Sequence, residues 1–368
     1  MKYYIIAGEA SGDLHGSNLI KEIKKKDPLA IIRCWGGDLM KSEGGTIVKH
    51  IKDLSFMGFW EVILNLRTIL NNLLFCKKDI ISFNPDTIIY IDYPGFNLRI
   101  AKWAKKYSFN NQYYISPQVW AWKENRVKFL KKYINNLYVI LPFEKDYFKN
   151  KHFLNVEYVG HPIVEHVLNN KINSSFKNEN NFDENKEIIT LLPGSRKQEI
   201  KKILPILLKV LKNFESYQFV IAGAPSIETK FYLSLLKKNN VKILHNNTYN
   251  LLFHSKAAIV TSGTATLEAA ILKTPQLVCY KTSSLSYFLA KRLVKLNYIS
   301  LVNLILNKEV VKELIQKDCN VEQITIELNK LLSNKNNSIV KDYEILLRIL
   351  GNKKTSEKTA ELIINSTN

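Results

Sequence analysis

The sequence predicts an α/β protein with two Rossmann-like, doubly wound domains facing a cleft, followed by a helical tail. Three observations predict this class. Short β-branched runs alternate with helical segments in both halves, a glycine-containing turn follows the first strand of each half, and the pattern is helical from about Val321. Strands that alternate with helices are typical of βαβ units and parallel sheets. A chain of 368 residues also suits two domains rather than one.

The first half contains six short runs that are rich in β-branched and aromatic residues. We expect strands at Tyr3–Ile6, Ala30–Cys34, Thr87–Ile91, Gln112–Ile115, Leu137–Leu141 and Val156–Val159. Helical segments are expected at Leu14–Lys26, Asn97–Tyr107 and Lys123–Tyr133. Residues 168–187, after a Gly-His-Pro turn, are rich in Asn, Lys and Glu, which is typical of a linker or a surface excursion.

The second half repeats this alternation. We expect strands at Ile188–Leu192, Gln218–Ala222, Val241–Leu244, Ala257–Thr261 and Gln276–Tyr280. The chain then divides into an N-terminal domain (1–165), a polar linker (166–187), a C-terminal domain (188–340) and terminal helices (341–368) that pack back on the N-terminal domain. Because doubly wound sheets bind ligands beyond the carboxyl ends of their strands, we expect a site in the cleft.

Composition limits the compartment and the partners. The net charge is +20, from 46 Lys and only seven Arg against 33 acidic residues. A codon bias toward Lys, Asn and Ile is one explanation of this charge, and binding to an anionic membrane surface is another. Binding to a nucleic acid is not expected, because nucleic-acid-binding proteins favour the guanidinium fork of Arg. Four scattered cysteines without a CxxC pair favour a reducing compartment and no zinc site. The sequence has neither a secretory leader pattern nor an apolar run of spanning length, which predicts a cytoplasmic protein.

The loop Gly8-Glu9-Ala10-Ser11-Gly12-Asp13 lies between the first strand and a helix. Small residues let a ligand approach the backbone, and the helix N-terminus favours an anion. The alternative is an ordinary tight turn. The loop matches neither the dinucleotide fingerprint, nor the Walker motif, nor the nucleophile elbow.

Two loops in the second half are suited to a diphosphate. Leu192-Pro193-Gly194-Ser195-Arg196 offers backbone N–H groups and the guanidinium of Arg196. Thr261–Ala270 gives a hydroxyl-rich glycine loop and then a helix that carries Glu268 in its first turn; alternatively Thr264 only caps that helix. No Asp-x-Asp occurs and the histidines show no ligand spacing, so we expect no metal and no other cofactor.

The carboxyl end of the apolar strand 87–91 presents Asp92, which is placed to act as a general base or else as a turn residue. Asp86, at the opposite end of that strand, is less well placed for direct chemistry. Trp120 and Trp122 lie on a later loop, where they can line a sugar or acyl site or fill the core.

The segment Glu61–Lys78 is amphipathic at helical spacing. Its apolar stripe comprises Val62, Ile63, Leu66, Ile69, Leu70, Leu73 and Leu74. One such stripe is enough to pack on a sheet. Additional apolar residues and the terminal lysines also suit an interfacial helix that enters a lipid surface.

Taken together, the motifs resemble those of one enzyme family. They are, in order, GEASGD, MGFWEV, IDYPGFN, YYISPQVWAWK, LPFEK, VGHP, LLPGSR, AGAP, TSGTATLEAA, PQLVCYKT and LVNLI. Between residue 8 and about residue 305 this series resembles the lipid-A-disaccharide synthases. The resemblance implies an inverting, metal-independent GT-B glycosyltransferase. It would join UDP-2,3-diacylglucosamine to 2,3-diacylglucosamine 1-phosphate (lipid X), at the cytoplasmic face of the inner membrane.

The resemblance also implies roles for residues of this chain. Those expected to hold UDP are Gly194, Ser195, Arg196, Gly263, Thr264, Ala265, Thr266, Glu268 and Asn303. Those expected on the acceptor and catalytic side are Glu9, Ser11, Gly12, Met57, Asp86, Asp92 and Gln118. The family often has a second acid where this chain has Gly95, so Asp92 or Glu9 must serve as the base here.

Three alternatives to this function are kept. Another UDP-GlcNAc-dependent GT-B enzyme, such as a 2-epimerase or the lipid-II-forming transferase, would share the fold. A DNA-binding protein is suggested by the charge alone, and a UDP-sensing scaffold would lack turnover. We expect peripheral membrane association, with a homodimer as one possible state.

Overall fold

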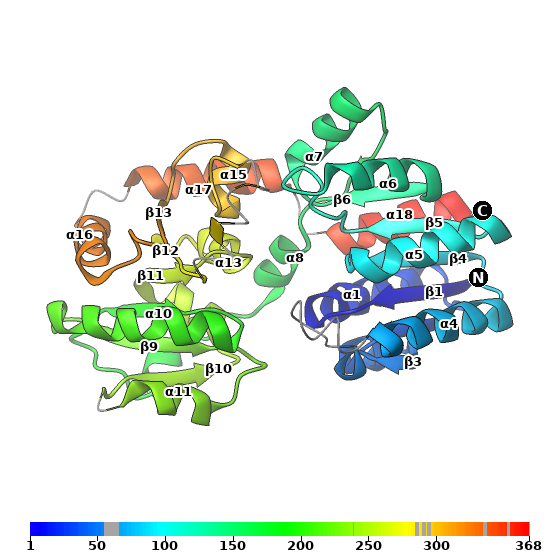
Figure 1. The fold of residues 1–368 in the computed structure, drawn as a ribbon. Helices are drawn as coiled ribbons and strands as arrows, with labels where there is room; N and C mark the ends of the chain where they lie inside the picture. Colours follow the sequence, from blue (N-terminus) through cyan, green and yellow to red (C-terminus); the bar gives the residue numbers. More distant parts are fainter. Residues whose placement is uncertain are drawn as a thin grey trace. The chain divides into compact units, whose positions relative to one another are not determined.

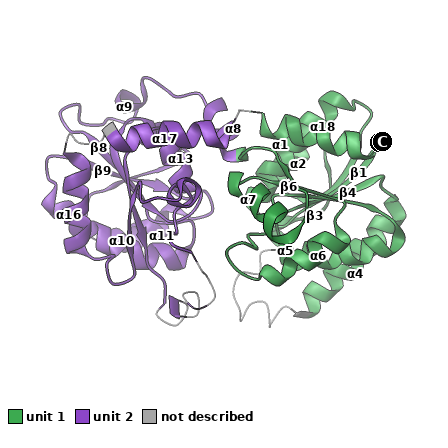
Figure 2. Cartoon of the chain, turned by 90° about the horizontal axis from the view of Figure 1, so that it is seen from above, with its two compact units in different colours: residues 1–162, 354–368 green, residues 163–353 purple. Residues whose placement is uncertain are grey.

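The computed structural model describes residues 1–54, 66–237, 239–283, 287–288, 292, 296–333, 337–351 and 354–367. The chain forms two compact units (Figure 2). Unit 1 comprises Met1–Pro162 and Lys354–Asn368, and unit 2 comprises Ile163–Lys353. The chain therefore leaves unit 1, builds unit 2 and returns.

Unit 1 contains a seven-stranded parallel sheet in the order β3-β2-β1-β4-β5-β6-β7 among its described residues (Figure 1). Its strands are β1 (Lys2–Ala7), β2 (Ile31–Gly36), β3 (Thr46–His50), β4 (Thr87–Ile91), β5 (Asn110–Tyr114), β6 (Asn136–Val139) and β7 (Glu157–Tyr158). Its helices are α1 (Ala10–Lys26), α2 (Asp38–Ser42), α4 (Leu66–Phe83), α5 (Pro94–Ala104), α6 (Val127–Tyr133), α7 (Pro142–Asp146) and α18 (Thr355–Thr367).

Helices cover both faces of this sheet because its central strands are apolar on both sides. Alternate residues of β1 point to opposite faces. Tyr4 and Ile6 join the core beneath α4 and α5, whereas Tyr3 and Ile5 join the core beneath α1 and α18. The C-terminal helix is thus part of the unit 1 core.

Two buried carboxylates fix the helices nearest the first strands. Asp79 of α4 accepts a hydrogen bond from Tyr4 (2.8 Å) and forms an ion pair with Arg33 (2.5 Å). Asp13 of α1 accepts the backbone N–H groups of Gly37 (2.7 Å) and Met40 (3.1 Å) at the start of α2. Asp13 therefore has a structural role, although it lies in the first glycine-containing loop and helix turn.

The described part of unit 2 has a six-stranded parallel sheet in the order β10-β9-β8-β11-β12-β13. Its strands are β8 (Ile188–Leu192), β9 (Gln218–Gly223), β10 (Lys242–His245), β11 (Ser255–Thr261), β12 (Gln276–Tyr280) and β13 (Lys312–Ile315). Its helices are α8 (Pro162–Asn169), α9 (Phe176–Glu179), α10 (Lys197–Val210), α11 (Thr229–Leu236), α12 (Thr248–Phe253), α13 (Ala265–Ile271), α15 (Leu301–Leu306), α16 (Val321–Leu332) and α17 (Asn337–Leu350). The predicted fold class, two parallel Rossmann-like sheets, is confirmed.

The units divide the chain at other residues than we expected. The segment 166–187 is not a separate linker, because Phe176 and Phe182 are buried against Ile188 and Leu251 in unit 2. Of the terminal helices, α17 belongs to unit 2 and only α18 packs in unit 1. The amphipathic helix also differs from its expected bounds: α4 continues to Phe83, and Glu61–Asn65 lie outside the described residues.

Candidate functional site

Of the seven described residues of unit 1 other than glycine that have positive φ, four lie beyond the carboxyl ends of β4 and β5. Asp92 (φ 44°) and Tyr93 (φ 50°) follow β4, while Ile115 (φ 66°) and Lys123 (φ 54°) lie in the loop after β5. Positive φ costs a residue other than glycine about 1–3 kcal/mol and is retained where surrounding contacts enforce it, often at functional sites. The carboxyl edge of this sheet is therefore the candidate site of unit 1.

The backbone of Asp92 is held from three directions. Its carbonyl accepts hydrogen bonds from the side chains of Asn97 (2.7 Å) and Tyr113 (2.6 Å), and its N–H donates to the carbonyl of Tyr114 (3.1 Å). Asn97 is fully buried and also reaches the ends of β1 and β4. These contacts leave the Asp92 carboxyl exposed at the edge.

The electrostatic surroundings of Asp92 suit a base that works near neutral pH. Surrounding protein raises the pKa of Asp92 to about 6 by desolvation, and the negative charge of Glu9 raises it further. The backbone N–H of Tyr93 and the positive charge of Arg126 oppose these effects. At pH 7 the carboxyl is therefore largely ionised, yet basic enough to accept a proton.

The first glycine-containing loop lies at the same edge. Glu9 precedes α1, and Ser11 is exposed in the first turn of that helix. Gly8 is required by close packing, because a Cβ there would lie 2.4 Å from the ring of Tyr93. Gly12 is buried, and a Cβ added there would lie 3.0 Å from the Cβ of Ala7. The absence of a side chain at Gly12 therefore lets α1 pack closely on the sheet.

The other residues of unit 1 that we expected on the acceptor and catalytic side do not all lie near Asp92. Gln118 is exposed on the loop after β5. Asp86 precedes β4, and its carboxylate accepts the backbone N–H of Lys2 (2.7 Å) at the amino edge of the sheet, opposite Asp92. The structure thus gives Asp86 a structural contact away from Asp92, and its expected role on the acceptor side stays a prediction. Met57 lies outside the described residues.

The loop after β5 carries the predicted Trp120 and Trp122 and leads to Arg126, which the sequence patterns did not single out. Trp120 is anchored in the core, since its indole N–H donates to the buried carboxylate of Glu144 (3.1 Å) and its ring packs edge-on against Phe143. Burial raises the pKa of Glu144 to about 7, against three hydrogen bonds that lower it. Trp122 is 42% exposed, and Arg126 lies over its ring. Only spatial proximity to Asp92 identifies Arg126.

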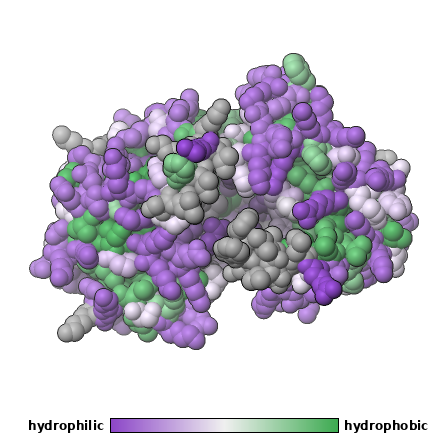
Figure 3. All heavy atoms as spheres, viewed as in Figure 1, coloured by the Kyte–Doolittle hydropathy of each residue, from purple (hydrophilic) through white to green (hydrophobic). Residues whose placement is uncertain are grey.

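The apolar stripe of α4 divides between core and surface. Leu73 is buried and Ile69 is partly buried against the same core, while Leu70 (52%) and Leu74 (58%) are exposed. Figure 3 shows apolar side chains at the surface in the part of the view where Figure 1 places α4. Val62 and Ile63 lie outside the described residues, and Leu66 begins the helix. No helix among the described residues is long and apolar enough to cross a membrane.

In unit 2, the turn Gly194-Ser195-Arg196 links β8 to α10. Gly194 has φ 127°, and a Cβ there would lie 2.8 Å from the side chain of Glu199. The carboxylate of Glu199 accepts the N–H of Ser195 (3.2 Å) and pairs with the guanidinium of Arg196 (3.3 Å). A carboxylate thus already occupies the donors that we expected to hold a phosphate.

The second loop follows β11. Gly263 (φ 150°) and Thr264 are exposed, and the Thr264 side chain makes no capping hydrogen bond, contrary to the capping-box alternative. Ala265, partly exposed, begins α13. Thr266 is buried, and its hydroxyl donates to the carbonyl of Gly263 (2.8 Å), so it shapes the loop. The ligand contact expected of Thr266 stays a prediction.

Glu268 and Asn303 differ in what they can offer a ligand. Glu268 is partly exposed and accepts a hydrogen bond from Tyr249 (3.0 Å); burial raises its pKa. Asn303 is fully buried, and its amide bonds the backbone of Val310 and Val311 and the carboxylate of Glu313. These bonds use the donors and the acceptor of the Asn303 amide, which shapes the turn between α15 and β13; its role in the UDP site stays a prediction.

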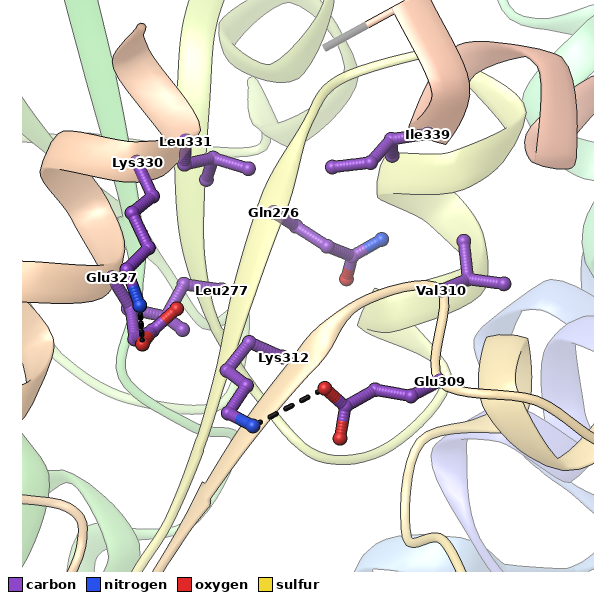
Figure 4. A pocket seen from close by; sticks show the side chains of 9 residues that line it. All are labelled: Gln276, Leu277, Glu309, Val310, Lys312, Glu327, Lys330, Leu331 and Ile339. Atoms are coloured by element: carbon purple, nitrogen blue, oxygen red, sulfur yellow. Dashed lines mark hydrogen bonds and ion pairs between the residues drawn. The ribbon is translucent and has the colours of Figure 1, made fainter. Parts of the chain in front are cut away.

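A surface pocket of about 200 Å³ in unit 2 lies away from these loops (Figure 4). Ion pairs of Glu309 with Lys312 (3.2 Å) and of Glu327 with Lys330 (2.7 Å) neutralise the charged groups that line it. Gln276 and Lys312 begin β12 and β13, which places the pocket at the amino edge of the sheet. The loops after β8 and β11 lie at the carboxyl edge.

Solved structures of other proteins share the fold. The UDP-GlcNAc 2-epimerase from Neisseria meningitidis, bound to UDP-GlcNAc, matches with a TM-score of 0.70 at 14% identity, covering 99% of this chain and 100% of that chain. The glycotransferase of kitacinnamycin matches with a TM-score of 0.67 at 10% identity, covering 100% and 99%. At such identities the likeness shows the fold alone, the two-domain GT-B architecture.

Comparisons of the sequence with known proteins identify the family. The lipid-A-disaccharide synthase of Syntrophus aciditrophicus (strain SB) is 37% identical over 335 residues, which cover 89% of this chain and 87% of that protein. The lipid-A-disaccharide synthase of Francisella philomiragia is 35% identical over 360 residues, covering 94% and 93%. A family model described as lipid-A-disaccharide synthetase matches residues 3–366. The chain therefore belongs to the lipid-A-disaccharide synthetase family, which is a family of glycosyltransferases.

Proposed function

We propose that the protein transfers 2,3-diacylglucosamine from UDP-2,3-diacylglucosamine to the 6-hydroxyl of lipid X, yielding the β-1,6-linked disaccharide 1-phosphate and UDP. Family membership makes the chain a lipid-A-disaccharide synthase. The observation that carries this function is the family match from residue 3 to residue 366, which includes both units. The 2-epimerase alternative rests only on structures at 16% identity or less and is not favoured.

We place the acceptor chemistry in unit 1. Asp92 takes the proton of the acceptor's 6-hydroxyl while the hydroxyl oxygen attacks the anomeric carbon of the donor. The bond between that carbon and UDP breaks on the opposite side, so the anomeric configuration is inverted. The ordinary pKa of an Asp is too low for efficient proton abstraction at pH 7, and the raised pKa of Asp92 supports this assignment. Glu9 tunes this pKa and is the second candidate base, while Ser11 and Gln118 are exposed at the same edge.

We place the donor in unit 2. Arg196 and the backbone of Gly194, Ser195 and residues 263–265 hold the diphosphate and stabilise the charge that develops on departing UDP. The exposure of these groups and the carboxylate of Glu199 at Ser195 and Arg196 support an anion site. We assign no metal to the reaction; full activity in excess EDTA is expected, and an inhibition that Mg²⁺ reverses would contradict the assignment.

We also propose that the protein binds the cytoplasmic face of the inner membrane peripherally. Both substrates are acylated, and the exposed Leu70 and Leu74 on α4 offer an apolar surface beside the exposed Lys78. The excess of basic residues suits the anionic lipids of that face.

Acceptor-dependent release of UDP tests the function directly. Purified protein is mixed with UDP-2,3-diacylglucosamine in micelles, with and without lipid X, and UDP and the disaccharide are measured. We expect both products only when lipid X is present, in equal amounts. UDP release without the acceptor, or conversion of UDP-GlcNAc to its 2-epimer, would reject the proposal.

A further inference from the structure

Two cations of unit 1 lie over one exposed aromatic ring in the loop that follows β5. The ammonium of Lys123 is 4.4 Å and the guanidinium of Arg126 is 5.5 Å from the ring of Trp122. Lys123 and Trp122 are exposed, and Arg126 is partly exposed. Cation–π contacts of this kind restrict the motion of both cations without neutralising their charge.

Neither cation has a carboxylate partner among the described residues. Glu124, which lies between them in sequence, pairs instead with Lys151 (2.7 Å) and His152 (3.1 Å). Basic side chains at a protein surface are usually flexible and solvated, but here the backbone that carries them has a defined conformation. Lys123 adopts φ 54°, and the N–H of Arg126 donates to its carbonyl (3.0 Å).

The core positions this pair. Val119 is buried, and Trp120 is tied to the buried carboxylate of Glu144, so the loop cannot move freely. The N–H of Trp122 donates to the carbonyl of Gln118 (3.3 Å). The two positive charges are therefore presented from an anchored loop at the carboxyl edge of the sheet.

Arg126 and Asp92 lie at the same edge of the sheet, because Arg126 follows β5, Asp92 follows β4, and these two strands pair. The positive charge of Arg126 opposes the larger effect of desolvation on the pKa of Asp92. A guanidinium without a carboxylate partner can bind an anion that a ligand supplies. In lipid X the carbons that carry the 1-phosphate and the 6-hydroxymethyl group, C1 and C5, flank the same ring oxygen, so a phosphate site is required no farther from the base than one sugar ring.

We infer that Arg126 and Lys123 form the subsite that binds the phosphate monoester of the acceptor. This inference rests on the proposed function and names a ligand contact within it. Arg126 supplies a guanidinium fork to the phosphate oxygens, and Lys123 adds a second positive charge. The subsite orients the sugar so that its 6-hydroxyl, rather than another hydroxyl, meets Asp92.

The test compares lipid X with the same diacylglucosamine lacking its phosphate. Turnover and equilibrium binding are both measured in neutral detergent micelles at pH 8, where Asp92 is ionised in all variants. We expect the wild-type protein to bind lipid X at least tenfold more tightly than the phosphate-free analogue. Arg126→Ala should lose most of this preference and Lys123→Ala part of it, while Arg126→Lys should retain part.

Lys128→Ala is the matched control, because it removes an exposed positive charge of the neighbouring helix α6. It should keep the full preference for lipid X. UDP binding, which we assign to unit 2, should be the same in all variants, and binding of the phosphate-free analogue reports that unit 1 is folded.

The outcomes separate the two proposals. If wild-type protein shows no acceptor-dependent transfer, the function fails, while the binding comparison still tests the subsite. If Arg126→Ala weakens binding of both acceptors equally, or changes neither, the subsite is rejected. If the preference for lipid X appears only when anionic vesicles replace the micelles, the cations bind lipid headgroups and the inference is also rejected.

Discussion

Asp92 combines a constrained backbone with a free carboxyl. Asn97, Tyr113 and Tyr114 use the backbone of Asp92 as a hydrogen-bonding partner, so its left-handed conformation is enforced while the side chain stays exposed. Gly95 carries no acid, although a Cβ there would meet no atom within 4 Å. We therefore propose Asp92 as the base in this chain, with Glu9 as the alternative.

We expect Asp92→Asn to lower kcat by about 10²–10⁴, because the amide cannot accept the proton. Steady-state rates at pH 8 and UDP binding by calorimetry measure this. UDP affinity should be unchanged, since we place UDP in unit 2. Full activity of Asp92→Asn together with an inactive Glu9→Gln would identify Glu9 as the base.

The pH dependence gives a second prediction. Because the ionised carboxyl is the active form and its pKa is raised to about 6, kcat/KM should fall as the pH drops through about 6. Glu9→Gln removes a negative charge that raises this pKa, so the acidic limb should move to lower pH; desolvation by the surrounding protein keeps the pKa of Asp92 above the usual range of an Asp. An acidic limb that stays in place would show that Glu9 does not act on the titrating group.

Arg196 is the residue of unit 2 to which we assign a role in the chemistry. We expect Arg196→Ala to lower kcat about 10²-fold or more, because it removes a donor to the charge on departing UDP. Lys209→Ala is the matched control, since Lys209 is an exposed charge near the far end of the same helix, α10. Comparable losses in both variants would mean that general charge, and not the turn, is responsible.

At the scale of elements, α4 serves two environments. Leu73 and Asp79 fasten it to the sheet, while Leu70 and Leu74 point outward on the adjoining face. Exposed apolar side chains of this size are not rare singly, but these two are one helical turn apart and Lys78 follows a turn later. Such an arrangement suits the boundary between lipid headgroups and acyl chains.

We expect the double variant Leu70→Ser with Leu74→Ser to bind anionic vesicles several-fold more weakly, as measured by sedimentation. Its melting temperature should change little, because both side chains are already largely solvated. Leu233→Ser in unit 2 is the matched control, with an exposure of 57% against 58% for Leu74. Equal vesicle binding by the double variant and the control would remove α4 as the membrane contact.

Elements were predictable where they are apolar and central. The strands β4, β8 and β12 match their expected bounds, because each is flanked by neighbours on both sides and is almost wholly apolar. The edge strands β3 and β13 were not predicted: β3 has no buried residue and β13 buries only Leu314. A strand that is half solvated has little hydrophobic pattern to detect.

The site was predictable only in part for a related reason. Loops after strands identify Asp92 and Arg196, because sequence order fixes which edge they occupy. Whether a polar side chain faces outward or inward depends on tertiary packing, which makes Asn303 and Thr266 buried structural residues. Arg126 is near Asp92 only because β4 and β5 are neighbours in the sheet.

At the scale of the whole molecule, the chain crosses between the units twice, and α18 completes unit 1 after unit 2 has been built. Ala360 and Ile363 are fully buried in the core with α1 and the sheet, and Gln112 bonds the hydroxyl of Ser366 (3.0 Å). We therefore expect the stability of unit 1 to depend on the last residues of the chain.

We therefore expect Ile363→Ala to destabilise unit 1 by about 2–5 kcal/mol, as is usual when a buried Ile is truncated, and to leave unit 2 unchanged. Denaturant unfolding should separate into two transitions, of which only one moves, while UDP affinity under native conditions stays constant. Asn365→Ala, an exposed position of the same helix, is the control and should move neither transition. If both transitions shifted together in Ile363→Ala, the two units would unfold as one cooperative body, and the return of the chain would couple donor binding to the integrity of the acceptor half.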